Sequence, residues 1–200
     1  MYQFFESIQL KDSALKHLDL HVQRMQRTCL FFYQEEKKMD ALLQELDALQ
    51  TYPTGLYKVK VKYNVHAHEI EITPYVPRVI QTLQVIINND IQYTWKTINR
   101  QVFFAYEVQR KATEDFLFVR QDCLTDSSYS NIALWNGQEW HTPETPLFNG
   151  IQREVLIQEG RIIVRKITLS DIRNYEKISL INAMLPLGEI EIPVANIFFP

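Results

Sequence analysis

The chain has 200 residues, a formal net charge of −3 and a hydrophobic fraction of 46%. This length allows one large domain or two small ones, either with a sizeable core, and the composition is that of an ordinary globular protein. The mild charge does not favour nucleic acid or an anionic membrane as a partner, and no apolar run is long enough to span a bilayer. The first residues lack the pattern of a secretory signal, so we expect a cytoplasmic protein.

In the first quarter of the chain, the pattern predicts a short strand and two helices. The strand covers residues 4–10. The apolar residues recur at helical spacing from Ala14 to Tyr33, with Ser13 as a plausible N-cap, and a second helix is expected from about Lys38 to Leu49.

Strict alternation of apolar and polar residues over 56–65 predicts a half-buried strand, and residues 67–73 repeat the pattern as its hairpin partner. Pro74 to Arg78 then interrupts the ladder and is typical of a linker. We therefore expect a small N-terminal α+β domain of residues 1–77 and a larger C-terminal domain of residues 78–200.

The second half alternates short strands and helices, which predicts an α+β fold for the whole chain. The dipeptide Asn136-Gly137 is a hairpin turn signal. The expected strands cover 83–87, 116–120, 130–135 and 161–166, the expected helices 99–111, 152–159 and 170–174, and two apolar stretches, 178–184 and 190–199, close the chain.

Cys29 and Cys123 are the only cysteines. The sequence alone leaves a disulfide open, but a reducing compartment favours two buried free thiols. No residues have the spacing of a metal site, and we interpret His66 and His68, two apart on one strand, as part of a polar sheet face. We therefore expect no metal.

Lys96 is the first candidate for chemistry. Lysines are mostly solvated, so an isolated lysine would be a surface residue. This one lies between Trp95 and Ile98 at a predicted strand-to-helix junction, where apolar neighbours disfavour the charged form and leave a nucleophilic amine. This setting is typical of a lysine that forms a Schiff base with pyridoxal phosphate.

Asp126 is the second candidate. The plain interpretation is a turn aspartate that caps the backbone amides of Ser127 and Ser128. The functional interpretation is a carboxylate that keeps the pyridine nitrogen of the cofactor protonated, with Asn131 bracing the loop.

The stretch from Asn149 to Gln152 is the third candidate, because it opens a predicted helix after a loop. A helix N-terminus with free N–H groups, beside a glycine (Gly150) that lets the backbone approach closely, predicts a phosphate site. Arg24, on the first predicted helix, would alone be a solvated arginine, but it is a natural countercharge for a phosphate.

These motifs together resemble the class IV aminotransferase-like family of pyridoxal-phosphate enzymes. That family includes branched-chain aminotransferases, D-amino-acid aminotransferases and 4-amino-4-deoxychorismate lyase. The resemblance runs from about Phe5 to Pro186. The motifs that carry it are His21-x-x-Arg24, Lys96-x-x-Asn99-Arg100, Asp126-x-x-x-x-Asn131 and Asn149-Gly150-Ile151-x-Arg153, and the segments most similar to the lyase branch are 96–100, 149–151 and 182–184.

The resemblance implies the two-domain α+β fold of D-amino-acid aminotransferases (fold type IV), with the cofactor in the cleft between the domains, and usually a homodimer. It implies Lys96 as the Schiff-base lysine and Asp126 as the pyridinium partner, a place where the family usually has Glu. The implied phosphate ligands are Arg24 and the backbone of Gly150, Ile151 and Gln152, with Asn182 or Ala183 nearby.

The lyase branch implies release of pyruvate from 4-amino-4-deoxychorismate to give 4-aminobenzoate, on the way to folate. That substrate carries two carboxylates, for which Arg100 is a candidate partner. The row of Lys58, Lys60 and Lys62 is another, although a solvated sheet face is the simpler interpretation of that row.

Two alternatives stay open. A class IV aminotransferase acting on a branched-chain or D-amino acid would use the same lysine to move the proton to a different carbon and would release a keto acid. A homologue without activity would only bind the cofactor or a partner. Intact Lys96 and Asp126 argue against that second alternative.

Overall fold

The first strand, β1 (Phe4–Lys11), alternates buried and half-buried residues, as a strand with one face in a core does. In this computed structural model, which describes all 200 residues, β1 lies in a four-stranded antiparallel sheet of order β2-β1-β3-β4. The other strands are β2 (Ala14–Leu15), β3 (Leu56–Tyr63) and β4 (His68–Pro74).

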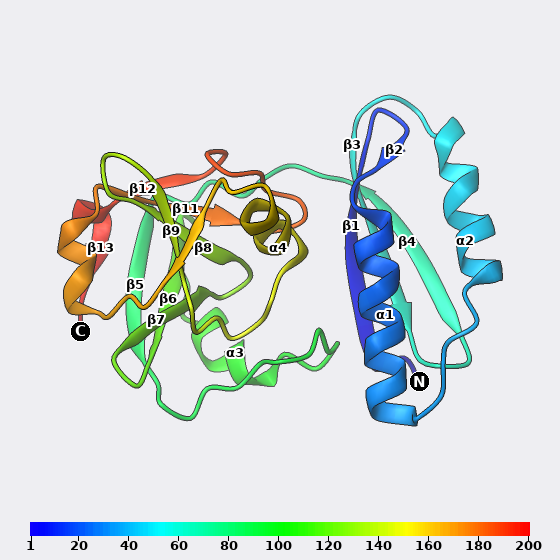
Figure 1. Cartoon of the computed structure of the whole chain (residues 1–200), viewed down its shortest axis with the longest axis horizontal. Coiled ribbons are helices and arrows are strands. Elements are labelled where there is room, and N and C mark those ends of the chain that lie inside the picture. The colour runs from blue at the N-terminus through cyan, green and yellow to red at the C-terminus, as the bar shows by residue number, and fades with distance from the viewer. The chain divides into compact units, whose positions relative to one another are not determined.

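Two helices pack on one face of this sheet, α1 (Leu18–Tyr33) and α2 (Asp40–Asp47), the latter continued by the 3₁₀ turn η1 (Ala48–Thr51) (Figure 1). Their apolar side chains form one core with the inward residues of the sheet, which include Met25, Leu42, Val59 and Val61. The alternation predicted for residues 56–65 is confirmed, because the valines are buried and the lysines between them are not.

The start of α1 differs from the prediction. Ala14 and Leu15 pair with Lys11 and Leu10 in a tight hairpin, so they cannot join the helix. Ser13 is not an N-cap, because its hydroxyl donates to the Tyr52 carbonyl at 2.7 Å. Helix α1 begins only at Leu18.

The opposite face of the sheet carries the lysine row. Lys62 forms ion pairs with Glu69 at 2.9 Å and with Glu71 at 3.5 Å, both on the neighbouring strand. This arrangement matches the simpler interpretation of the row as a polar sheet face.

The chain forms two compact units, one of residues 1–76 with 95–99 and one of residues 77–94 with 100–200. The predicted domain boundary at residue 77 stays a prediction, and these units differ from it at residues 95–99, which belong to the first unit. This short segment contains Lys96.

Hydrogen bonds attach residues 95–99 to the edge of β1. The Phe5 N–H donates to the Lys96 carbonyl at 3.0 Å, and the Ile98 N–H donates to the Gln3 carbonyl at 2.9 Å. The ring of Trp95 lies 4.6 Å from that of Phe31, centroid to centroid, on α1. Both backbone pairing and aromatic packing therefore fix the backbone around Lys96.

The second unit contains two sheets, of order β13-β5-β6-β7 and β10-β9-β8-β11-β12. Its elements are β5 (Thr82–Ile87), α3 (Gln101–Glu107), β6 (Glu114–Arg120), β7 (Cys123–Ser127), β8 (Asn131–Trp135), β9 (Trp140–Pro143), α4 (Ile151–Gln158), β10 (Ile163–Arg165), η2 (Ser170–Asn174), β11 (Lys177–Ile181), β12 (Glu191–Pro193), η3 (Val194–Asn196) and β13 (Ile197–Phe198).

The pairing in these sheets is mixed. Strands β5 and β6 are parallel, and β6 continues into β7 through an antiparallel turn. Helix α3 packs its Phe103 against Phe116 and Phe118 of β6, and helix α4 packs its Leu156 against Ala133 of β8. The mixture of helices and strands confirms the predicted α+β class.

Two further elements differ from the sequence-based expectation. Helix α3 ends at Glu107, four residues short of the predicted end at Lys111. Strand β7 was not expected as a separate strand, and its residues are buried throughout.

Both cysteines are buried and free, as expected. No helix is both long and apolar enough to cross a membrane.

Candidate functional site

A buried carboxylate organises the polar residues of the first unit. Glu6 lies among the inward positions of β1 and has no exposed surface. Its Oε1 accepts a hydrogen bond from Arg24 Nε at 2.8 Å, and its Oε2 accepts a second bond from Arg24 Nη2. The Nδ1 of His21 lies 2.7 Å from the same Oε2. Helix α1 places His21 and Arg24 one turn apart, so both reach the one carboxylate.

The surroundings lower the pKa of both Glu6 and His21. Burial alone would raise the pKa of Glu6, but the charge of Arg24 and hydrogen bonds from His21 and Arg24 lower that pKa to about 2. Burial is the main cause that lowers the pKa of His21, against the opposing effect of Glu6. A carboxylate can only accept, so His21 Nδ1 carries the proton, and its buried Nε2 has no hydrogen-bond partner.

Lys96 lies at the same end of β1. Its Nζ is 4.8 Å from the centroid of the Phe5 ring, while its carbonyl accepts the Phe5 N–H. Phe5, which pairs with Lys96, precedes Glu6 on β1, and the charge of Lys96, like that of Arg24, lowers the pKa of His21 after burial. The structure thus brings together two predicted site residues that are distant in sequence.

In the second unit, Asp126 lies on strand β7. Its Oδ1 accepts from Asn131 Nδ2 at 2.7 Å and its Oδ2 from the Phe148 N–H at 2.9 Å. These partners replace the amides of Ser127 and Ser128 that a turn aspartate would cap. Burial raises the pKa of Asp126 to about 6, because neutral donors compensate a buried charge only in part.

Asn131 connects this carboxylate to the start of helix α4. Its Nδ2 also donates to the Phe148 carbonyl at 2.7 Å, and its Oδ1 accepts the Gly150 N–H at 3.1 Å. A Cβ added to Gly150 would lie 2.3 Å from that Oδ1, so only glycine fits. No side chain caps α4, whose first residues are Ile151 and Gln152. The N-terminus of such a helix can bind an anion.

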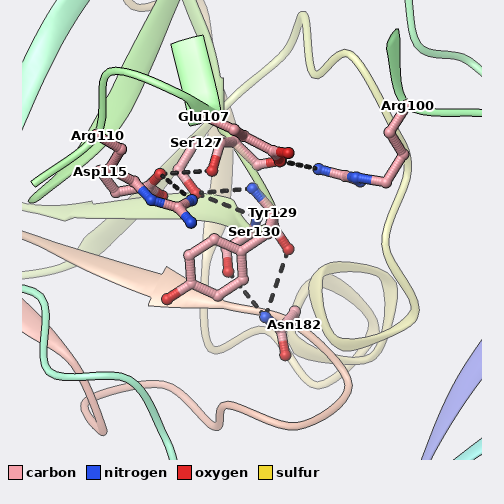
Figure 2. A network of polar contacts seen from close by, with 9 residues as sticks. Arg100, Glu107, Arg110, Asp115, Ser127, Tyr129, Ser130 and Asn182 are labelled. Atoms are coloured by element: carbon pink, nitrogen blue, oxygen red, sulfur yellow. Dashed lines mark hydrogen bonds and ion pairs between the residues drawn. The ribbon is translucent and has the colours of Figure 1, made fainter. Parts of the chain in front are cut away.

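Asn182 and Ala183 lie in a tight turn after strand β11. The Nδ2 of Asn182 donates to Ser130 Oγ at 2.8 Å (Figure 2), and its Oδ1 accepts the Met184 N–H at 2.8 Å. Ala183 is half-buried beside it. This turn therefore contacts the loop between β7 and β8 that separates Asp126 from Asn131.

Arg100 has its guanidinium engaged within the second unit. Its Nη2 donates to the Ser128 carbonyl at 2.5 Å. The same Nη2 lies 3.4 Å from Glu107 Oε1 (Figure 2). The guanidinium carbon also lies 4.7 Å from the centroid of the Phe103 ring. These contacts attach α3 to the loop after β7.

Sequence reasoning missed Glu6 as a site residue and used His21 only as part of a motif. The sequence did contain a signal. Alternate residues of β1 point inward, and Glu6 is a carboxylate in a series whose other members, Phe4, Ile8 and Leu10, are apolar. A charged residue in the apolar phase of a strand needs a buried partner.

The residues present fit pyridoxal phosphate, the cofactor that the resemblance implies. The group carries an aldehyde for a lysine amine, a ring nitrogen that can hold a proton, and a phosphate. Asp126 is a buried carboxylate whose hydrogen-bond donors are neutral, and a protonated ring nitrogen would supply a charged donor. Helix α4 begins without a capping side chain, and Arg24 presents a guanidinium that is 11% exposed.

Comparison with known proteins gives consistent matches over nearly the whole chain. Residues 3–192 match the family described as amino-transferase class IV. An uncharacterized protein of Haemophilus influenzae is 32% identical over 188 residues, which are 92% of this chain and 98% of that protein.

Solved structures share the fold. A protein of Haemophilus somnus 129PT, provisionally named a 4-amino-4-deoxychorismate lyase, is 29% identical with a TM-score of 0.85, over 94% of this chain and 98% of that one. A hypothetical aminotransferase of Mycobacterium tuberculosis, with α-ketoglutarate and PMP bound, is 16% identical with a TM-score of 0.78, over 96% and 83% of the two chains.

Proposed function

Because the chain belongs to the class IV aminotransferase family of pyridoxal-phosphate-dependent enzymes, we propose that it is a 4-amino-4-deoxychorismate lyase. Such an enzyme releases pyruvate from its substrate and leaves 4-aminobenzoate. The similarity to the Haemophilus somnus protein, which bears that name provisionally, supports the lyase branch over nearly the full length of both chains.

One observation carries the proposal at the level of the site. Lys96 is paired with Phe5 on β1, and the next residue on that strand, Glu6, holds Arg24. An amine and a guanidinium that the folding of the first unit brings together suit a ligand that has both an aldehyde and a phosphate.

The other proposed cofactor residues belong to the second unit. Asp126, oriented by Asn131, is the proposed partner of the ring nitrogen. The phosphate would receive the N–H groups of Ile151 and Gln152 next to Gly150, whose own N–H binds Asn131. Asn182 and Ala183 are proposed as neighbours of the phosphate. For the substrate we propose Arg100 only in a secondary role, because its guanidinium already binds Ser128 and Glu107.

The chemistry that pyridoxal phosphate supplies when bound is an electron sink at the carbon that bears the substrate's amino group. Lys96 is then the general base that removes the proton from this carbon. The bond from the ring to the enolpyruvyl oxygen breaks, the leaving group takes up a proton to become pyruvate, and the remaining ring is aromatic.

From the family resemblance alone we also propose a cytoplasmic homodimer that acts on the way to folate, with domains that divide near residue 77. Sedimentation equilibrium of the purified protein tests the dimer, because a single species of twice the chain mass is expected.

A class IV aminotransferase is the second candidate. The Mycobacterium tuberculosis protein named an aminotransferase shares the fold, and its structure contains PMP and α-ketoglutarate. In that reaction Lys96 would return the proton to a different carbon, and the product would be a keto acid. The cofactor residues are the same for both reactions, so the products decide between them.

The test is to incubate the purified protein with pyridoxal phosphate and 4-amino-4-deoxychorismate and to measure 4-aminobenzoate and pyruvate. We expect both products in equal amounts, none with Lys96→Ala, and an unchanged rate with Lys111→Ala, which alters an exposed lysine. A keto acid formed from an amino acid, without 4-aminobenzoate, would favour the aminotransferase. A visible cofactor band without either product would contradict both reactions.

A further inference from the structure

Glu6 has a structural cost that its surroundings must offset. A carboxylate without exposed surface loses its hydration, and removal from water costs several kcal/mol per ion unless good partners replace it. Arg24 and His21 are those partners, and the pKa of Glu6, which burial alone would raise, is lowered to about 2 by them. An apolar residue at this position would have packed into the core at no such cost.

The contact with Arg24 constrains the guanidinium more than a single hydrogen bond could. Glu6 binds both Nε and Nη2, which is a bidentate pair along one edge of the planar group. The plane of the guanidinium and the direction of its outer edge are therefore fixed. The Arg24 side chain is 11% exposed, whereas the Glu6 side chain has no exposed surface.

His21 fixes the carboxylate in turn. Its Nδ1 lies 2.7 Å from Oε2, the oxygen that also accepts from Arg24 Nη2. One oxygen therefore receives two donors from the same helix, and the carboxylate cannot rotate without losing one of them.

The same strand holds Lys96. The Phe5 N–H binds the Lys96 carbonyl, and Phe5 immediately precedes Glu6. Two adjacent residues of β1 thus connect to the lysine segment on one side and to Arg24 on the other.

We propose that Glu6 and His21 are positioning residues for the cofactor phosphate: they hold Arg24 in the orientation that binds it, at a distance from Lys96 that β1 sets. This inference rests on the proposed function, because it takes Arg24 as a phosphate ligand. It assigns a role to two residues that do not themselves touch the cofactor.

The test compares pyridoxal phosphate with pyridoxal, which has the same aldehyde and ring but no phosphate. Dissociation constants are measured by absorbance titration for wild type and for Glu6→Gln, which keeps the side-chain shape but removes the charge. We expect Glu6→Gln to weaken pyridoxal phosphate by about 10- to 100-fold, the usual value of charged hydrogen bonds, and pyridoxal by less than about 3-fold.

Arg24→Met and the double variant complete a cycle. If Glu6 acts through Arg24, Arg24→Met loses as much of the preference for pyridoxal phosphate over pyridoxal as Glu6→Gln does. The variant that carries both substitutions then loses no more. Glu45→Gln is the matched control, since Glu45 also pairs with a histidine, His68, at 3.0 Å, but on the surface of the same unit. It should leave both affinities unchanged.

The outcomes separate this inference from the proposed function. If Arg24→Met loses the discrimination and Glu6→Gln keeps it, Arg24 binds phosphate and the positioning role is wrong. If Glu6→Gln weakens both ligands equally, its role is structural and the inference is also overturned. If Arg24→Met keeps the discrimination, the proposed phosphate site itself is wrong.

A second pair of variants applies if Glu6→Gln does not fold. His21→Asn retains a nitrogen where Nδ1 lies, and His21→Leu does not. We expect Asn to preserve most of the preference for pyridoxal phosphate and Leu to lose it. Equal preferences in the two variants would overturn the role of His21.

Discussion

Asp126 shows how one residue can be destabilising by itself and still suit a site. Its two carboxylate oxygens are held by neutral N–H donors, and burial raises its pKa to about 6. A protonated ring nitrogen would convert this unfavourable charge into an ion pair. Asp126 is one methylene shorter than the Glu that the family usually has here. The Asn131 carboxamide and the Phe148 N–H donate hydrogen bonds to it.

The raised pKa of Asp126 makes the stability of the protein without cofactor depend on pH. The pKa of Asp126 is higher in the folded state than the usual 3.8, so the folded protein binds that proton more tightly. The contribution of this proton to the free energy of unfolding is fully present below pH 3.8. It is lost as the pH rises through about 6, a change of about 3 kcal/mol.

Denaturant unfolding between pH 4 and pH 8 checks this prediction. The free energy of unfolding of wild type minus that of Asp126→Asn should fall over this range, and saturating pyridoxal phosphate should reduce the fall. A difference that stays constant with pH would contradict the raised pKa.

At the residue scale, the motifs predicted which side chains to examine, because Lys96, Asp126 and Gly150 each have a chemistry that local sequence reveals. The role of Glu6 depends on residues from a different element, His21 and Arg24, that meet only in the fold. A single sequence shows that a carboxylate stands in the apolar phase of a strand, but not which side chains compensate it.

Strand β1 is the element on which the first unit's polar residues depend. It pairs with β3 along its length, but residues 95–99 cover the part of its outer edge near Phe4 and Phe5. Trp95 anchors that segment on α1, with its ring 4.6 Å from Phe31 and 5.1 Å from Phe32.

We therefore predict that Trp95→Ala weakens the attachment of residues 95–99 to β1. The loss of this half-buried ring should destabilise the protein by about 2 to 3 kcal/mol and increase hydrogen exchange at the Phe5 and Ile98 amides. Trp140→Ala is the control, because it removes a half-buried ring that packs against Trp135 in the second unit. Unchanged exchange at both amides in Trp95→Ala would contradict the anchoring role.

The start of helix α4 gives a second prediction at this scale. Gly150→Ala places a methyl group against the Asn131 carboxamide, which cannot move without losing its bonds to Asp126 and Phe148. We expect a loss of about 1 to 3 kcal/mol, as in overpacked cores, together with weaker binding of pyridoxal phosphate.

Thermal unfolding and absorbance titration measure the two effects. Asn131→Ala in the same chain should relieve part of the steric cost. Gly160→Asn is the comparison, because nothing lies within 4 Å of a Cβ there and asparagine tolerates its positive φ. Equal stability of Gly150→Ala and wild type would refute the close approach to Asn131.

The sequence predicted most elements because their periodicities are strong, as in the alternating residues 56–65. It missed the hairpin of Ala14 and Leu15, since helical spacing of leucines continues through it. It missed strand β7 because Thr125, Asp126 and Ser127 are polar residues typical of turns, and their burial depends on neighbours from β6.

For the whole molecule, the resemblance was the most informative signal, because the order of the motifs is preserved over nearly the full chain. The family match over residues 3–192 agrees with that extent. What periodicity could not predict is the return of residues 95–99 to the first unit, since two backbone hydrogen bonds and one tryptophan determine it.

The proposed function requires that Lys96 binds pyridoxal phosphate covalently. Borohydride reduction of the protein with its cofactor, followed by peptide mass spectrometry, tests it most directly, because reduction fixes the cofactor to the lysine that holds it. We predict one phosphopyridoxyl group per chain, on the peptide that contains Lys96, and none in Lys96→Ala. Labelling of another lysine, or of no lysine in the wild type, would contradict this role of Lys96.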